Sequence, residues 1–385
     1  MVEKARHAPQ PSVLPPEARL AWLRLARSRG VGPVTFVKLL ERYGSPQAAL
    51  KALPSLALRG GEDGSTVCSV EAAELELAAV DRLGATMMAL VEAGYPKLLK
   101  EIPDPPTMLT VNGRAACLDG PCVAVVGARN ASGNGRLFAS QLGRELAAAG
   151  VVVVSGLARG IDTAAHEGVL AAGGETVAVI AAGVDIVYPP ENADLMARIA
   201  ETGAVVSERP IGADVRAKDF PRRNRIIAGL ALGVVVVEAA PGSGSLITAR
   251  LAGEQGREVM AVPGSPLDPR HKGTNQLLRE GATLVQSAAD VLEVLGPLLT
   301  RRPAPREKEK VRTPPRREAP RPAPIEPGPL PSRLVAALGP APLGVDELIR
   351  QCQASPPEIQ AALLELELDG RLERHPGNRV SLRAG

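Results

Sequence analysis

A cluster of basic side chains directly precedes a long apolar run. Arg222, Arg223, Asn224 and Arg225 come immediately before residues 226–237, which are all apolar or glycine. Positive charge at the edge of a buried segment is costly unless an anion neutralises it. A planar guanidinium group matches phosphate oxygens well, because it donates two parallel hydrogen bonds. The cluster therefore predicts a phosphate-binding site.

The cluster belongs to a longer basic segment, residues 209–225, which holds six basic and two acidic side chains. A solvated surface is the ordinary interpretation of such a run, but this run adjoins a segment that must be buried. Several charges spaced along a chain suit a polymer of phosphates better than a single nucleotide. Phe220 lies in the same segment and either stacks on a nucleobase or packs in the core.

Three loops rich in small residues follow predicted strands, at residues 127–135, 155–160 and 238–245. Where such a loop opens a helix, its backbone amides can cradle a phosphate. Arg159 can reach an anion there, and the hydroxyls of Ser243 and Ser245 add donors. The first loop does not have the Gly-x-Gly-x-x-Gly pattern, and no acidic residue ends the second strand. A dinucleotide cofactor is therefore disfavoured.

Two groups of residues raise the question of catalysis. Asp162 and His166 lie one helical turn apart and form either an acid–base pair or a helix-start hydrogen bond that fixes the loop. The second interpretation is favoured, because no nucleophile or second carboxylate adjoins them. Glu238, at a strand end, is likewise expected to be a structural acceptor. The four cysteines have no metal-ligand spacing, so the sequence predicts no metal site. Together with the interpretations of Asp162, His166 and Glu238 above, it also predicts no catalytic residue and no cofactor.

These residues follow apolar runs that alternate with helical patterns between residues 122 and 296. Strands that are apolar at every position are buried on both faces, and their alternation with helices predicts an α/β protein with a doubly wound, mostly parallel sheet. Ligands of such sheets bind beyond the carboxyl ends of the strands. The predicted strands are Cys122–Val126, Val151–Val154, Thr176–Ala181, Ala204–Ser207, Val234–Val237 and Val259–Val262, and the helices include Arg136–Ala149 and Ile161–Ala172.

The flanking sequence predicts further domains. Two helical patterns separated by the turn at residues 30–33 are typical of a helix-hairpin-helix that binds a DNA phosphate, or of a plain helical hairpin. The C-terminal segment predicts a winged helix whose third helix, Pro357–Leu368, is acidic, which favours a protein partner over DNA. The expected domains are a disordered N-terminus (1–16), a helical domain (17–90), the sheet domain (91–298), a proline-rich linker (299–329) and the winged helix (330–385).

Composition narrows the function classes. A length of 385 residues allows two or three domains. The net charge of +3 gives no overall attraction to nucleic acid, so an anion site must come from local clustering. One Trp, three Tyr and three Phe are too few for a long base-stacking platform. The sequence has no signal-peptide pattern and no apolar run of membrane length, so we expect a cytoplasmic protein without a membrane partner.

A series of short motifs follows in order from residue 95 to about residue 290: Tyr95-Pro96, Asp104–Pro106, Gly113, Val126–Arg129, Ser155–His166, Ala182–Asp185, Tyr188–Asn192, Phe220–Leu230, Val237–Ala239, Ser243–Ala249, Gly256–Glu258, Val262–Gly264, Gly273–Asn275 and Gly281-Ala282. With these motifs the sequence resembles the DNA-processing protein A family of bacteria, also called DprA or Smf. The resemblance implies an extended Rossmann-like sheet domain, an N-terminal domain similar to a sterile alpha motif, and a C-terminal winged helix. Ala128 departs from the family's usual Ser or Thr, and Asn134 from a frequent aromatic residue.

The family resemblance implies a protein that is not an enzyme. Such a protein binds single-stranded DNA, forms a homodimer through its sheet domain, and loads the RecA recombinase in natural transformation or recombinational repair, with single-strand-binding protein as a further partner. The competing hypothesis is a nucleotide-binding enzyme of the phosphoribohydrolase type, but the first glutamate after its phosphate loop is Glu254, too far along. The implied DNA contacts are Gly127, Arg129, Gly156, Arg159, Lys218, Phe220, Arg223, Asn224, Arg225, Ser243 and Ser245.

Overall fold

The structure is a computed structural model that describes residues 13–59, 67–299 and most of 330–382. The chain divides into two compact units, Met1–Pro305 and Arg306–Gly385, and each has its own hydrophobic core. None of the helices in the described part is long and apolar enough to cross a membrane. The predicted disordered tail up to residue 12, and the predicted linker from residue 300 to 329, lie outside the described residues.

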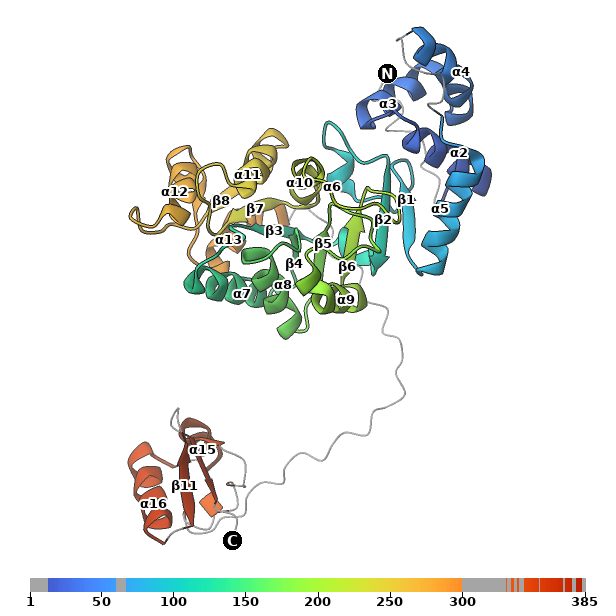
Figure 1. The fold of residues 1–385 in the computed structure, drawn as a ribbon. Helices are drawn as coiled ribbons and strands as arrows, with labels where there is room; N and C mark the ends of the chain where they lie inside the picture. The colour runs from blue at the N-terminus through green and yellow to red at the C-terminus, as the bar shows by residue number, and fades with distance from the viewer. Residues whose placement is uncertain are drawn as a thin grey trace. The chain divides into compact units, whose positions relative to one another are not determined.

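The first unit is built on a nine-stranded sheet with the order β1-β2-β6-β5-β4-β3-β7-β8-β9 (Figure 1). In this spatial order, all strands from β6 through β3 to β9 pair in parallel. At one edge, β1 pairs antiparallel with β2, and β2 pairs antiparallel with β6. The predicted doubly wound, mostly parallel sheet is thereby confirmed. The strands are β1 (Thr86–Ala89), β2 (Met108–Gly113), β3 (Cys122–Val126), β4 (Val152–Ser155), β5 (Thr176–Val179), β6 (Ala204–Ser207), β7 (Gly233–Val236), β8 (Glu258–Ala261) and β9 (Thr283–Leu284).

Helices cover both faces of this sheet. One face carries α6 (Lys97–Lys100), α10 (Asp219–Leu230), α11 (Gly244–Glu254) and α12 (Lys272–Arg279), and the other carries α7 (Gly133–Ala148), α8 (Ile161–Ala171), α9 (Ala193–Thr202) and α13 (Ala288–Leu299). Short 3-10 helices lie at Ala115–Asp119, Pro190–Asn192 and Pro269–His271.

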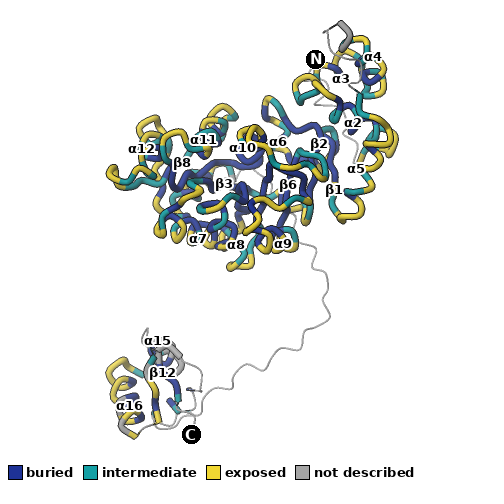
Figure 2. The backbone as a smooth tube through the Cα atoms, in the orientation of Figure 1, coloured by how far each residue is buried: buried dark blue, intermediate teal, exposed yellow. Residues whose placement is uncertain are grey.

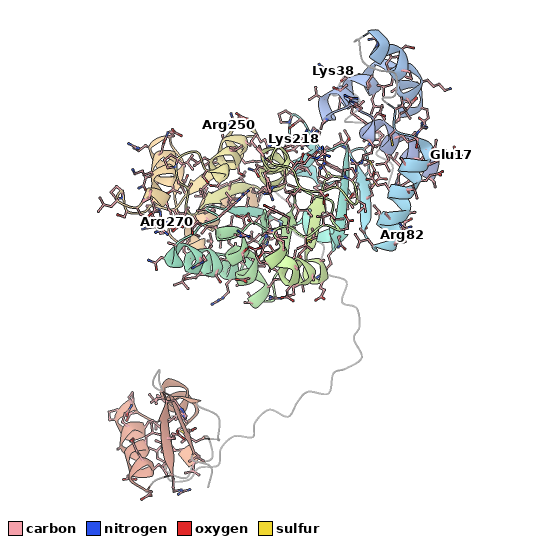
Figure 3. The ribbon with its side chains drawn as sticks, viewed as in Figure 1. Glu17, Lys38, Arg82, Lys218, Arg250 and Arg270 are labelled. Atoms are coloured by element: carbon pink, nitrogen blue, oxygen red, sulfur yellow. The ribbon has the colours of Figure 1, made fainter. Side chains whose placement is uncertain are left out.

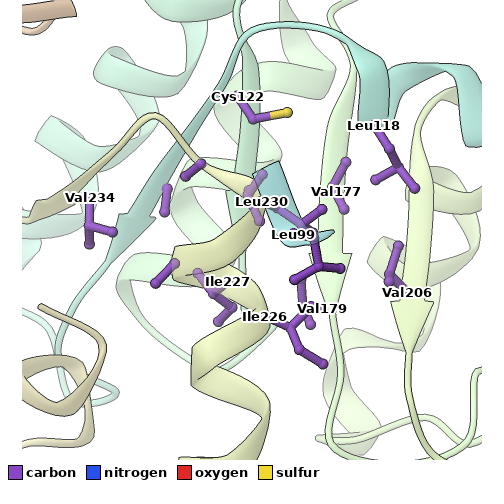
Figure 4. Close-up of a cluster of buried hydrophobic side chains, with 14 of the residues drawn as sticks. Leu99, Leu118, Cys122, Val177, Val179, Val206, Ile226, Ile227, Leu230 and Val234 are labelled. Carbon is purple, nitrogen blue, oxygen red and sulfur yellow. The ribbon is translucent and has the colours of Figure 1, made fainter. Parts of the chain in front are cut away.

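The central strands are buried because each supplies side chains to two cores. Val126 and Val154 point into the core below α10 and α11, whereas Val125 and Val153 point into the core below α7 and α8. Figure 4 shows the first of these cores, in which apolar side chains of α10 lie against those of the neighbouring strands. In Figure 2 the same strands are dark blue between partly exposed helices.

The N-terminal helices are α2 (Pro16–Arg27), α3 (Pro33–Tyr43), α4 (Pro46–Arg59) and α5 (Val70–Arg82). The predicted hairpin between α2 and α3 forms, and the rings of Trp22 and Phe36 pack with their centroids 4.8 Å apart. These helices share their core with the sheet, because Met87 and Met108 belong to the same hydrophobic cluster. The Trp22 indole also donates a hydrogen bond to the Thr107 carbonyl, at 2.9 Å. The helical domain is therefore fixed to the antiparallel edge of the sheet.

The second unit is the predicted winged helix. It contains β10 (Leu343–Gly344), α15 (Val345–Cys352), α16 (Pro356–Leu368), β11 (Leu372–His375) and β12 (Arg379–Leu382), with strand order β10-β12-β11. Ser355 and Glu358 form a capping box at the start of α16. The acidic side chains of this helix, Glu358, Glu365 and Glu367, are exposed, as the charge pattern predicted.

Candidate nucleic-acid interface

The predicted site residues gather where the chain reverses its direction along the sheet, between β3 and β7. Two helices begin beside this reversal point, α7 after β3 and α11 after β7. Such crevices at the carboxyl ends of parallel strands are the usual ligand sites of doubly wound sheets. The N-terminus of α10 reaches the same edge, because Arg223 donates hydrogen bonds to the carbonyls of Gly156, at 2.7 Å, and Val179. The basic cluster and the small-residue loops therefore meet in space.

Arg223 is a deeply placed cation of this edge, with 6% of its surface exposed. Burial lowers the pKa of Arg223 to about 10, although the nearby Asp162 raises it, so the side chain is charged at neutral pH. Gly156 makes room for the guanidinium group, because a Cβ atom there would lie 2.4 Å from Arg223 Nη1. Gly156 was predicted as a DNA contact, and in the structure the group that lies against it is the guanidinium of Arg223.

The loop after β4 is fixed by Asp162. Its carboxylate accepts hydrogen bonds from the amides of Gly156, at 3.1 Å, and Ala158, at 3.3 Å. Burial raises the pKa of Asp162, whereas the charge of Arg223 and these hydrogen bonds lower it. His166 bonds Thr176 instead of Asp162, with 2.7 Å between Nδ1 and Oγ1. The favoured interpretation of Asp162 as a loop-fixing residue is confirmed, and the alternative acid–base pair does not form.

Two aromatic rings and an arginine form the outer wall. The rings of Tyr188 and Phe220 have centroids 5.6 Å apart, and Arg129 Cζ lies 4.8 Å from the centroid of Phe220. The hollow beneath them, next to Gly156 and Arg223, has a volume of about 10 Å³, which is room for one water molecule. A base would therefore stack on the outer surface of these rings in the present conformation. Tyr188 was not among the predicted contacts. Because aromatic residues are scarce in this sequence, its position in a motif was a signal that could have included it.

The helix that begins after β7 carries two serine hydroxyl groups at its N-terminus. Ser243 caps α11, and its Oγ lies 2.7 Å from Ser245 Oγ. Asn224 Nδ2 donates to the Gly244 carbonyl at 3.1 Å, which ties α10 to this loop. A helix N-terminus with serine hydroxyls attracts an anion. Ser243, Ser245 and Asn224 thus lie together, as the sequence predicted.

The helix that begins after β3 is different, because a carboxylate already lies at its N-terminus. Glu238 is fully buried, and its carboxylate accepts two hydrogen bonds from Ser132. The Ser132 amide lies 2.9 Å from Oε2, and the Ser132 hydroxyl lies 2.5 Å from Oε1. A Cβ atom at Gly135 would lie 2.5 Å from a Glu238 oxygen. The interpretation of Glu238 as a structural acceptor is confirmed. Since this carboxylate compensates the helix dipole of α7, an anion finds a better site at α11.

Three predicted cations are exposed at this edge: Arg129, Arg159 and Lys218. Arg159 pairs with Glu191, and the two side chains are 64% and 46% exposed. Ion pairs with this much exposure contribute little to stability, so a phosphate can replace the carboxylate at low cost. Figure 3 shows Lys218 near the start of α10, far from Arg82 in the helical domain.

Arg225 has protein partners, which the sequence reasoning missed. Its guanidinium group pairs with Glu208 and lies 3.2 Å from Asp104, and the side chain is 5% exposed. Arg222 is half-exposed and lies 3.6 Å from Glu208. The charge of Arg225 is therefore neutralised within the protein. Its assignment as a DNA contact stays a prediction, and its observed role is to hold α10.

The sheet and its site define a class: an α/β protein with a cationic, partly aromatic edge at the reversal point of the sheet, flanked by two smaller domains. Among the residues that the structure describes, no group of acidic, histidine and cysteine side chains is arranged to hold a metal ion. The family model for DNA recombination-mediator protein A matches residues 86–296. Models for the DprA-like N-terminal HHH domain and the DprA winged helix domain match residues 16–79 and 318–378. The chain belongs to the DNA recombination-mediator protein A family.

Individual relatives agree with this membership. Protein Smf of Synechocystis is 32% identical over 94% of this chain and 98% of its own length. The DNA processing protein DprA of Streptococcus pneumoniae is 46% identical over 53% of this chain and 72% of its own length. The X-ray structure of DprA from S. pneumoniae has a TM-score of 0.61 and 37% identity, covering 71% of this chain and 95% of that chain. A Helicobacter pylori structure, described by its single-stranded DNA binding mode, has a TM-score of 0.51 and 29% identity, covering 55% and 96%.

Proposed function

We propose that this protein binds single-stranded DNA along the carboxyl edge of its sheet and is not an enzyme. The observation that carries the proposal is the position of Arg129 over Phe220, beside Tyr188. A cation next to an exposed ring and a partly buried one can bind a backbone phosphate and stack a base at one point. The related structure from H. pylori, described by its single-stranded DNA binding mode, supports the same ligand.

The arrangement of charges suits a strand better than a single nucleotide. Arg159, Lys218 and the α11 loop lie on different elements around one open edge. The phosphoribohydrolase alternative is not favoured. In α11 the only acidic residue is Glu254, the last residue of the helix, which at about 1.5 Å per residue lies roughly 15 Å along the helix axis from the loop.

We further propose that the bound strand is handed to RecA, in transformation or in recombinational repair. The family membership supports this role, and it also supports a homodimer formed through the sheet domain. The exposed acidic face of α16 suits a protein partner with a basic surface better than DNA. We also propose that the protein contacts single-strand-binding protein and acts in the cytoplasm.

Replacing Arg129 with alanine should weaken binding of an oligothymidine strand by about tenfold, because one phosphate contact and one cation–π contact are lost. The slope of log affinity against log salt should become shallower by about 0.7, the value for one phosphate on a single strand. Fluorescence anisotropy at several salt concentrations measures both quantities. Arg82→Ala, which removes an exposed arginine far from this edge, is the control (Figure 3). Unchanged affinity in both Arg129→Ala and Phe220→Ala would show that the strand binds elsewhere.

The RecA step has its own test. On single strands already coated with single-strand-binding protein, the wild-type protein should shorten the lag before RecA filaments form. Arg129→Ala should restore most of the lag, because handing over a strand requires holding it. The measurement is RecA ATPase activity against time. A wild-type protein that binds DNA tightly and leaves the lag unchanged would contradict the loading role while leaving DNA binding intact.

A further inference from the structure

One wall of the candidate site is a segment without helix or strand, residues 208–218, which joins β6 to α10. The segment carries Val215, which lines the hollow beneath Phe220, and ends at Lys218, directly before α10. Such a segment has no ladder of backbone hydrogen bonds to keep its shape. Its position must come from the groups that hold it at particular points.

The sheet domain holds the middle of this segment. The Gly212 amide donates to the Asp185 carboxylate, at 2.9 Å from Oδ1 and 3.0 Å from Oδ2. The Ala213 carbonyl accepts a hydrogen bond from the Gly183 amide at 2.9 Å. These contacts join the segment to the loop after β5, which also carries Tyr188. At the beginning of the segment, the Arg209 amide donates to Ser207 Oγ of β6, at 2.9 Å.

The helical domain adds a second restraint at the beginning of the segment. Arg27, the last residue of α2, donates from Nη1 to the Glu208 carbonyl at 3.1 Å. The other edge of its guanidinium group binds Glu76 of α5, with 2.7 Å between Nη2 and Oε1. Both side chains are largely buried, at 15% and 10% exposed. Ile211 adds an apolar contact, because it packs against the core of the helical domain and also against the cluster below α9.

Glu208 passes this restraint on to α10. Its backbone carbonyl is held by Arg27, while its carboxylate pairs with Arg225 and Arg222 of α10. The same helix places Arg223 against the Gly156 carbonyl. A continuous set of ion pairs and hydrogen bonds therefore runs from α5 of the helical domain to the floor of the candidate site.

We propose that Arg27 is a positioning residue for single-stranded DNA binding, through which the helical domain holds residues 208–218 as a wall of the site. This inference rests on the proposed function and adds a role for a domain outside the sheet. The planar fork matters, because it binds Glu76 and the Glu208 carbonyl at once. The ammonium group of a lysine cannot reproduce that geometry.

The test uses the full-length Arg27→Ala and Arg27→Lys proteins, with Arg19→Ala as the matched control. Arg19 lies on the same helix and docks the helical domain through the Met87 carbonyl, at 2.9 Å, and Glu92, away from residues 208–218. Hydrogen exchange of peptides from residues 183–186 and 208–218 measures the restraint directly. Anisotropy with oligothymidine measures binding. A double-mutant cycle with Lys218→Ala shows whether Arg27 acts through the segment.

We expect faster exchange in residues 208–218 and about fivefold to tenfold weaker binding for both Arg27 variants, with less than additive losses when Lys218→Ala is combined. Arg19→Ala should match the wild type in both measurements. Unchanged exchange and affinity in the Arg27 variants would overturn the proposal, and so would an equal loss in Arg19→Ala, since loosening the domain would then be the cause. If Arg27→Ala does not fold, the exchange and the affinity of Arg27→Lys test the proposal. A wild-type protein without DNA binding would contradict the proposed function, while the exchange data would still report on Arg27.

Discussion

Arg223→Ala should abolish measurable binding of single-stranded DNA, a loss on the order of 100-fold or more. The side chain is 6% exposed and supports the loops after β4 and β5 by donating to the carbonyls of Gly156 and Val179. Without it, these carbonyls lose their donor, and the buried Asp162 carboxylate loses the cation that lowers its pKa. Removing one member of such a buried charged group costs about 3–5 kcal/mol of the free energy of unfolding.

The neighbouring position supplies the control for this experiment. Arg222 is half-exposed, 3.6 Å from Glu208, so Arg222→Ala should change the unfolding free energy by less than about 1 kcal/mol. Urea unfolding and anisotropy on the two variants separate stability from binding. Arg223→Lys should keep the charge and recover part of the stability, without the fixed planar geometry from which Arg223 Nη1 donates to both carbonyls. Wild-type affinity in a folded Arg223→Ala protein would remove Arg223 from the site.

Acidification should destabilise the protein strongly through His166. Burial lowers the pKa of this histidine to about 3, below its ordinary 6.5. Thr176 donates its only hydroxyl proton to the Val153 carbonyl, at 2.7 Å, so His166 Nδ1 must carry a proton and donate to Thr176. His166 Nε2 has no hydrogen-bond partner within the described part of the chain. Charging the ring would place a proton on this buried atom, which explains the direction of the shift.

The free energy of unfolding falls as the pH falls because the pKa of His166 differs between the folded and the unfolded protein. Below pH 6.5 the unfolded chain gains a proton at His166 that the folded chain does not, so stability is complete above that pH and falls until about pH 3. Between pH 7 and pH 4.5 the loss through this residue should be about 2–3 kcal/mol. His166→Asn keeps a donor for Thr176 and removes the titration, so urea unfolding against pH should show a flatter curve. Parallel curves for the two proteins would refute the assignment.

The comparison of wild type with His166→Asn is needed because the pKa of the buried Asp162 carboxyl is also shifted. Asp162 acts in the opposite direction. Its pKa is raised by burial, so the folded state binds a proton more readily than the unfolded state, and stability through Asp162 increases as pH falls. The difference between the two proteins isolates the contribution of His166.

Much of the sheet was predictable because buried parallel strands are apolar at every position. The strands from Cys122 to Ala261 were predicted within two residues of their observed ends. The edge strands were not predicted. In β1, Thr86–Ala89 is short and contains no strongly β-favouring run, and in β9 both residues are exposed. These strands pair with β2 and β8 through backbone hydrogen bonds, which side-chain patterns do not encode.

The site was predictable in its loops and not in its ion pairs. The loops after β3, β4 and β7 lie at one edge because the topology of a parallel sheet requires it. The positions of Gly156 and Ser243 followed from that rule. The partners of Arg225 did not, because Glu208 and Asp104 come from other segments of the chain. An arginine beside a buried run signals that a counter-charge exists, and only the fold shows whether protein or ligand supplies it.

The contacts of α10 have a consequence for how the chain acquires its activity during synthesis. Arg223 reaches carbonyls that precede it by 67 and 44 residues, while Asn224 binds a carbonyl 20 residues after it. Contacts of such long range form late in folding. A nascent chain that ends before β7 already contains Arg129, Arg159 and Arg223 and yet lacks the α11 loop that closes the site. Under the proposed function, the site is therefore complete only when the second half of the sheet has been added.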